Sequence, residues 1–139
     1  MSLKFLSDIE AGTIIEDIAA AVSSGTNNRN HDIDFAKSHA NYTVTAVNAA
    51  SNKITFSNLG STIVGKHGSI IITNPSAVGS YTWLGSSGLP ATAYTPGGQQ
   101  ITFDTTASKI AIITYFVIAS DKVLINYAGA FSAYEQAAP

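Results

Sequence analysis

The segment from Lys109 to Tyr127 constrains the fold of this chain more than any other. An apolar run that ends at Ile118 meets a polar turn, Ala119-Ser-Asp-Lys, and continues into a second apolar run. Two β-type runs joined by so short a polar turn predict a β-hairpin. The chain is therefore expected to contain a sheet whose apolar side chains pack against something else.

Charge is too sparse for most chemistry. Only 12% of the 139 residues are charged, about half the usual share, and residues 54–103 contain a single charged side chain, Lys66. The net charge of −2 predicts no basic surface for nucleic acid or an anionic membrane. Cysteine is absent, which excludes disulfides and thiolate metal sites. These features favour a structural or binding protein over an enzyme.

Neither a secretory signal nor a membrane helix is predicted. Acidic residues appear within residues 1–10, where a signal peptide would place its apolar segment. No uncharged apolar run approaches the ~20 residues that a membrane-spanning helix needs.

The uneven distribution of charge divides the chain into three parts. Residues 1–53 hold ten of the sixteen charged side chains, whereas the later residues are rich in β-type runs. We therefore predict an N-terminal anchoring arm over 1–40, a β domain over 41–131 and a C-terminal tail over 132–139.

One short helix is predicted in the arm. Thr13 and Glu16 have the spacing of a capping box, and Ser23-Ser-Gly gives a stop signal. Four apolar residues recur between them at helical spacing, namely Ile14, Ile15, Ile18 and Val22. A helix of about ten residues is marginal alone, so this apolar face is expected to anchor the arm on the β domain or on another chain.

The β domain is expected to be all-β. Short β-type runs are separated by turn residues at fairly even spacing, and no helical segments alternate with them. This pattern predicts an antiparallel, jelly-roll-like β-sandwich of about seven or eight strands. The runs that predict strands are 42–47, 53–56, 69–73, 81–84, 100–103, 109–118 and 122–127, with a hairpin-like loop between the first two.

The run 109–118 differs from the others because it is apolar on both faces. A half-exposed strand alternates apolar and polar residues, but here Ile112, Ile113, Phe116 and Val117 supply apolar side chains to both sides. A second layer of the domain and a neighbouring subunit are both possible covers. The strand is expected to be central or at an interface, with 122–127 nearer the edge.

Catalytic and metal sites have few candidate residues. The three histidines, His31, His39 and His67, occur in no recognisable triad setting. Asp32 and Asp34 would share one face of a strand as metal ligands, but a polar connector explains them more simply. No cofactor and no metal site is predicted.

Gly65-Lys-His-Gly is expected to be a turn before a strand, because it lacks the spacing of a phosphate loop and no helix follows it. The alternative is that His67 lines a symmetry axis and binds a metal ion or an anion there.

Three aromatic residues suggest a ligand surface. Tyr81, Trp83 and Tyr94 lie near loops rich in glycine, serine and proline, and Trp and Tyr are enriched at binding surfaces. Tyr81 and Trp83 share a face if they are in a strand. The competing interpretation places both in the core.

The order of motifs in 41–131 resembles a group of phage proteins. The motifs are Gly68-Ser-Ile-Ile-Ile-Thr-Asn-Pro, Tyr81-Thr-Trp, Gln100-Ile-Thr-Phe-Asp, the apolar run 110–118 and the closing run 122–127. They are similar to the C-terminal domains of bacteriophage tail fibres and to small β domains of fibre and head-decoration proteins.

The resemblance implies a virion structural protein that forms a homotrimer. It would decorate the capsid exterior as a head fibre or belong to the tail, with the arm docked on major capsid or tail proteins. The residues expected at the contact between copies are Ile112, Phe116, Ile118 and His67. The alternative function is a tail-fibre tip or module that binds a receptor or cell-surface carbohydrate through Trp83, Tyr81 and Tyr94.

Overall fold

The chain is represented by a computed structural model that describes residues 15–22, 28–48, 50–76, 82–83 and 89–135. For residues 22, 82, 83 and 130 it describes the backbone alone. The described part is built almost entirely of β-strands, with two single-turn 3₁₀ segments, η2 (Ser61–Ile63) and η4 (Pro96–Gly98). The all-β prediction is confirmed.

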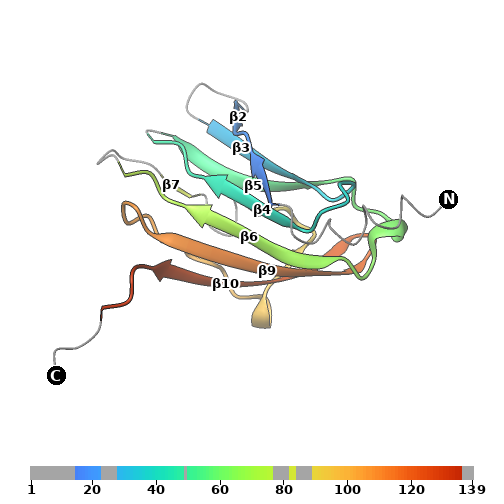
Figure 1. Cartoon of the computed structure of the whole chain (residues 1–139). Coiled ribbons are helices and arrows are strands. Elements are labelled where there is room, and N and C mark those ends of the chain that lie inside the picture. Colours follow the sequence, from blue (N-terminus) through green and yellow to red (C-terminus); the bar gives the residue numbers. More distant parts are fainter. Residues whose placement is uncertain (1–14, 23–27, 49, 77–81, 84–88, 136–139) are drawn as a thin grey trace, which may run out of the picture.

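The strands form two sheets (Figure 1). Sheet A has the order β1-β4-β6-β9-β10-β8, with β1 (Ile15–Ile18), β4 (Asn41–Thr45), β6 (His67–Thr73), β9 (Ile110–Ala119), β10 (Lys122–Phe131) and β8 (Ala93–Tyr94). Sheet B has the order β2-β3-β5-β7, with β2 (Ala21–Val22), β3 (Asn28–Asp34), β5 (Ser51–Ser57) and β7 (Thr82–Trp83).

The chain alternates between the sheets from β3 to β7, so that successive strands in one sheet are parallel. Strands β4 and β6 pair in parallel in sheet A, as do β3 and β5 in sheet B. Side chains bonded across the parallel pairs are 23 residues apart for Thr55 and Asp32 and 28 apart for Ser69 and Asn41. Each turn of the coil is therefore one strand of each sheet, which is the connectivity of a β-solenoid.

The jelly-roll-like antiparallel sandwich is wrong in its connectivity. The loop between β4 and β5 was expected to close a hairpin, but it carries the chain from sheet A to sheet B. The buried side chain of Asn52 holds this corner: it accepts a hydrogen bond from the Val47 N–H at 2.9 Å and donates to the carbonyls of Val47 and Ala50. A corner stabilised in this way has the same turn-like composition as a hairpin loop.

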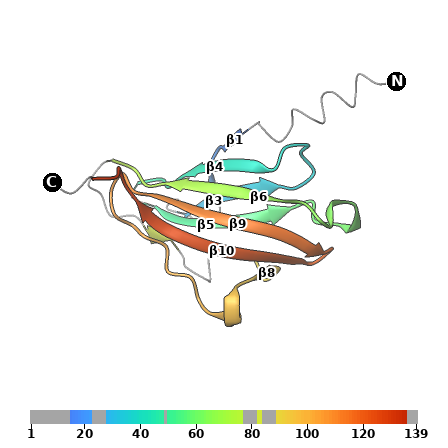
Figure 2. The same cartoon turned by 60° about the horizontal axis from the view of Figure 1, so that its bottom comes forward.

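The two strands predicted at the C-terminal end do form a hairpin. Strands β9 and β10 pair antiparallel, and β9 pairs antiparallel with β6 on its other side. Strand β9 is therefore central and β10 lies nearer the edge, as predicted, with only Val123 and Leu124 paired to β8. Figure 2 shows the hairpin continuing sheet A beyond the parallel strands.

The core lies between the sheets. Along β9 the residues Ala111, Ile113, Tyr115 and Val117 are buried, while those between them face away from the core. The remaining buried apolar residues come from both sheets and their corners: Ile33, Phe35, Tyr42, Val44, Ala46, Ile54, Ile70, Ile72, Phe103, Val123 and Ile125.

The predicted N-terminal helix is wrong. Ile15–Ile18 forms β1, which pairs in parallel with β4, and the backbone of Val22 pairs with Arg29 in sheet B. A four-residue strand completes an existing sheet edge, whereas an isolated helix of this length gains little stability. The boundary proposed near residue 40 falls between β3 and β4, which are successive strands of the same coil.

The strand expected at 100–103 is also wrong, since this stretch has no regular structure. Phe103 is buried there because its ring packs edge-on against Tyr127, with ring centroids 5.1 Å apart. The Asp104 N–H donates to the Tyr127 hydroxyl at 2.9 Å. An apolar side chain in a strand-like sequence thus anchors a loop.

Candidate interaction surface

The outer side of sheet A carries exposed apolar side chains on its central strand. Phe116 and Ile118 of β9 are 45% and 43% exposed, and Leu124 of β10 is 44% exposed. Alternation along a strand sends every second side chain outward, and β9 has apolar residues at nearly all outward positions. We call the outward side chains of this hairpin the apolar face: Ile110, Ile112, Phe116, Ile118, Leu124 and Phe131.

One row of the apolar face is aromatic at both ends. The strand register places His67 opposite Phe116, Phe116 opposite Leu124, and Leu124 opposite Tyr94. The His67 and Phe116 rings are stacked, 5.6 Å apart at an interplanar angle of 9°. The Lys122 ammonium lies 5.9 Å from the Tyr94 ring centroid. We call these four residues the aromatic row.

A polar row crosses the sheet beside the aromatic row. Register aligns Asn41, Ser69, Thr114 and Asn126 across four strands. The Ser69 hydroxyl donates to Asn41 Oδ1 at 3.1 Å. None of these side chains is charged, so the outer side of sheet A combines apolar contact area with neutral hydrogen-bonding groups.

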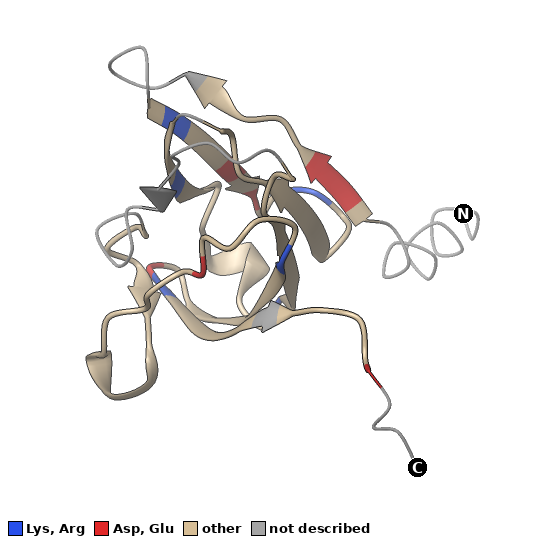
Figure 3. Cartoon of the chain, turned by 90° about the vertical axis from the view of Figure 1, so that its left-hand side faces the viewer, with Lys and Arg blue, Asp and Glu red and all other residues tan. Residues whose placement is uncertain are grey.

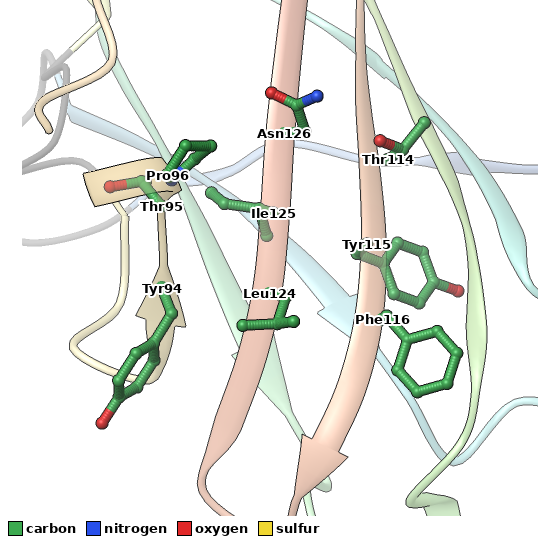
Figure 4. Close-up of a pocket in the computed structure, with 9 residues that line it drawn as sticks. All are labelled: Tyr94, Thr95, Pro96, Thr114, Tyr115, Phe116, Leu124, Ile125 and Asn126. Carbon is green, nitrogen blue, oxygen red and sulfur yellow. The ribbon is translucent and has the colours of Figure 1, made fainter. Parts of the chain in front are cut away.

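A shallow groove of about 390 Å³ lies between the β8–η4 segment and the hairpin. Figure 4 shows Tyr94 and Pro96 on one side of β10 and Phe116 and Thr114 on β9 at the other. Its lining consists of Tyr94, Thr95, Pro96, Thr114, Tyr115, Phe116, Leu124, Ile125 and Asn126. The groove offers two aromatic rings with neutral polar groups between them.

The four residues predicted at an oligomer contact lie on the same side of sheet A. Ile112, Phe116 and Ile118 are alternate residues of β9, and His67 is stacked on Phe116. Ile112 is half-buried and lies opposite Ile71 and Ala128. Their use as a contact between copies stays a prediction.

The three aromatic residues predicted to bind a ligand are not brought together among the described residues. Tyr94 is 46% exposed and lines the groove. The Trp83 backbone pairs with Asn52 in sheet B, and its side chain lies outside the described part. Tyr81 also lies outside it. Phe116 is thus the partner of Tyr94 that the sequence did not suggest.

The predicted anchoring residues are distributed over both sheets. Ile15 is 53% exposed at the edge of sheet A, and Ile18 packs partly against the core. Val22 is described only by its backbone, in β2, and Ile14 lies outside the described residues.

The histidines and acids serve structural hydrogen bonds. His31 is fully buried, and its Nε2 lies 2.9 Å from Asn52 Oδ1. Burial lowers the His31 pKa, which the hydrogen bond with Asn52 partly opposes. Asp32, on the outer side of sheet B, accepts hydrogen bonds from the hydroxyls of Thr55 and Ser57 at 2.9 and 2.6 Å.

Asp34 is held in the same way, and no metal-binding group emerges. It accepts hydrogen bonds from the Asn58 amide and from the Ala36 N–H, which lower its pKa. His39 contacts Glu16 at 2.6 Å and so ties β1 to the following corner. In the described ranges no three His, Asp or Glu side chains are grouped as a metal site would require.

The Gly65-Lys-His-Gly turn holds the corner that follows β3. The Lys66 ammonium donates to the carbonyls of Phe35 and Lys37 at 2.9 and 2.7 Å. It also lies 5.8 Å from the centre of the Phe35 ring, and burial lowers its pKa. Gly65 has φ of 97°, a conformation that favours glycine. The sequence predicted the turn but gave no sign of this lysine's carbonyl partners.

No family model matches the chain, and neither a curated protein nor a solved structure matches it. Within the described residues, no helix has the length and apolar character to span a membrane. The site is therefore argued from its own geometry.

Proposed function

We propose that this chain is a structural protein that works as an assembled homotrimer, with copies in contact through the apolar face. The observation that supports this most is the outward row of β9, a central strand whose Ile110, Phe116 and Ile118 remain 42–45% exposed. Large side chains on a central strand are costly to leave in water, and covering them stabilises the assembly.

The size of the apolar face supports a protein contact. Tyr94, Ile110, Phe116, Ile118, Leu124 and Phe131 are each 42–50% exposed. Side chains of this size together expose roughly 600 Å², which is at the upper end for a patch on a monomer. A standard contact buries about 800 Å² per partner, and the adjoining polar row supplies the remainder.

The charge distribution also supports packing against a like surface. Figure 3 shows acidic and basic residues on the N-terminal strands, whereas the β9–β10 hairpin is uncharged between its ends. From Ile110 to Ser120 the sequence has no charged residue. Two copies can therefore approach through this surface without like-charge repulsion.

The setting proposed for this trimer is the exterior of a tailed phage, either on the capsid or on the tail. This part rests on the motif resemblance of residues 41–131. The N-terminal residues would attach the body to a major capsid or tail protein.

Sedimentation equilibrium of the purified full chain tests the assembly. The expected mass is three chains, stable on dilution to about 1 µM, as standard contacts of this size allow. A monomer at all concentrations would reject the proposal. Labelling the chain in images of intact phage particles tests the setting, and absence from particles would reject the virion role while leaving the trimer.

Carbohydrate binding is the second candidate, and the groove beside Tyr94 favours it. Aromatic faces stack on sugar rings, and Thr114 and Asn126 offer neutral hydrogen-bonding groups between the two rings. The sites overlap at Phe116, so one surface can serve only one of the two uses in a given state. A glycan array with the wild type and Tyr94→Ala separates them, since a signal lost in the variant supports binding at this groove.

A further inference from the structure

We infer that assembly through the apolar face is controlled by protonation of His67, so that acid releases the copies from one another. This rests on the proposed self-assembly and adds its regulation. The stacking of His67 on Phe116 places a titratable side chain within the aromatic row.

The hydrogen bonding of His67 identifies its neutral form and its protonation site. Nδ1 lies 3.1 Å from the Gly65 carbonyl oxygen. Because a carbonyl can only accept, Nδ1 carries the hydrogen in the neutral ring, and an added proton goes to Nε2. The neutral ring is then a flat, largely apolar continuation of Phe116.

The surroundings of His67 provide no acid to hold an imidazolium. Phe116 of β9 faces its ring. The neighbouring hollow of about 350 Å³ is lined by residues of the 35–40 corner and the 62–67 segment. Its charged side chains are Lys37 and Lys66, and no described acid lines it. The nearest acids are committed elsewhere, Asp34 to Asn58 and Glu16 to His39.

Assembly would therefore require neutral His67. A charge buried between copies without a partner is costly, and imidazole is the side chain that changes charge between pH 5 and 8. In a trimer, symmetry brings three such charges to equivalent positions. If each copy must release one proton to assemble, the association constant falls by up to about tenfold per subunit for each pH unit in acid.

Sedimentation velocity of the full chain at about pH 8 and about pH 5.5 tests the inference, because imidazole changes charge across this interval. The expected result is a trimer at the higher pH and a folded monomer at the lower, with circular dichroism confirming the fold. His67→Phe keeps a flat ring on Phe116 but cannot be protonated, so it should remain a trimer at both pH values. His39→Gln is the matched control and should keep the wild-type response.

The outcomes separate the inference from the proposed function. A wild type that is trimeric at both pH values would overturn the His67 control and leave the assembly in place. Acid dissociation that persists in His67→Phe would also overturn it, because another group would then carry the response. A monomeric wild type at both pH values would reject both proposals.

Discussion

The two outer sides of this molecule have opposite chemistry on the same backbone geometry. On sheet B, Asp32 is satisfied by the hydroxyls of Thr55 and Ser57, and the exposed side chains form a hydrogen-bonded polar surface. On sheet A, the equivalent outward positions of β9 carry Ile110, Phe116 and Ile118. Side-chain alternation fixes which residues point outward, but the residue types decide which side suits water and which suits a partner.

This contrast separates stability from assembly. Sheet B is finished by its own side chains, so changes on its outer side should affect folding slightly and assembly not at all. Outward changes on the hairpin should have the reverse effect. Each prediction below places a change on one side, or in the core between them, and asks which property responds.

The largest expected effect is loss of assembly from a charge on the apolar face. Phe116→Asp places a carboxylate in the centre of the aromatic row, where burial between copies would leave it without a partner. We expect a folded monomer by light scattering in place of a trimer. Lys53→Asp, on an outward position of sheet B, is the matched control and should remain trimeric. A trimeric Phe116→Asp would show that this surface is not the contact.

The largest expected loss of stability comes from Asn52→Ala. The Asn52 side chain bonds to His31 and to the backbone of Val47 and Ala50, all at a buried corner. Leaving several of these groups unsatisfied should lower the free energy of unfolding by about 2–4 kcal/mol. Urea denaturation measures this loss.

Thr55→Val, which removes a single hydroxyl on the outer side of sheet B, is the control for that measurement. It should change the free energy of unfolding by less than about 1 kcal/mol. An Asn52→Ala variant as stable as Thr55→Val would mean that the corner does not depend on this amide.

The sequence predicted the elements with strong local signals. The hairpin β9–β10, the turn before β6 and the central position of β9 all follow from apolar runs bounded by turn residues. The apolar face follows from the same signal, because residues 110–118 are apolar at both even and odd positions. What alternation alone left open was which set of residues faces the core.

The connectivity between strands could not be predicted, because it depends on contacts distant in sequence. A loop that reverses within one sheet and a loop that crosses to another have similar composition. The difference here lies in Asn52 and Lys66, whose partners are buried backbone groups of the corners. The same limit explains the false helix, since Ile15 and Ile18 fit a helical spacing but gain more by pairing with β4.

Acid should destabilise the folded monomer through His31, by a smaller amount. Burial lowers the His31 pKa in the folded chain, whereas an unfolded imidazole titrates near pH 6.5. Above that pH both states are neutral and the contribution is complete. Below it only the unfolded state takes up a proton, so the free energy of unfolding falls by up to about 1.4 kcal/mol per pH unit until the lowered pKa is reached.

Urea denaturation of Phe116→Asp at about pH 7.5 and about pH 5.5 measures this effect on either side of the unfolded-state titration without interference from assembly. Adding His39→Gln to that background should leave the pH response unchanged. Equal stability at both pH values would show that His31 is protonated as readily in the folded chain as in the unfolded one.

The smallest effect is expected on the outer side of sheet B. Asp32→Ala removes the acceptor of two hydroxyl hydrogen bonds, but the side chains of Thr55 and Ser57 can turn to water. The loss should be about 1 kcal/mol or less by urea denaturation, with the trimer mass unchanged. Ser69→Ala makes the matched change on sheet A, where one hydroxyl bond to Asn41 is lost. If Asp32→Ala dissociated the trimer and Ser69→Ala did not, the contact would lie on sheet B, and the contrast between the two sides would have to be reversed.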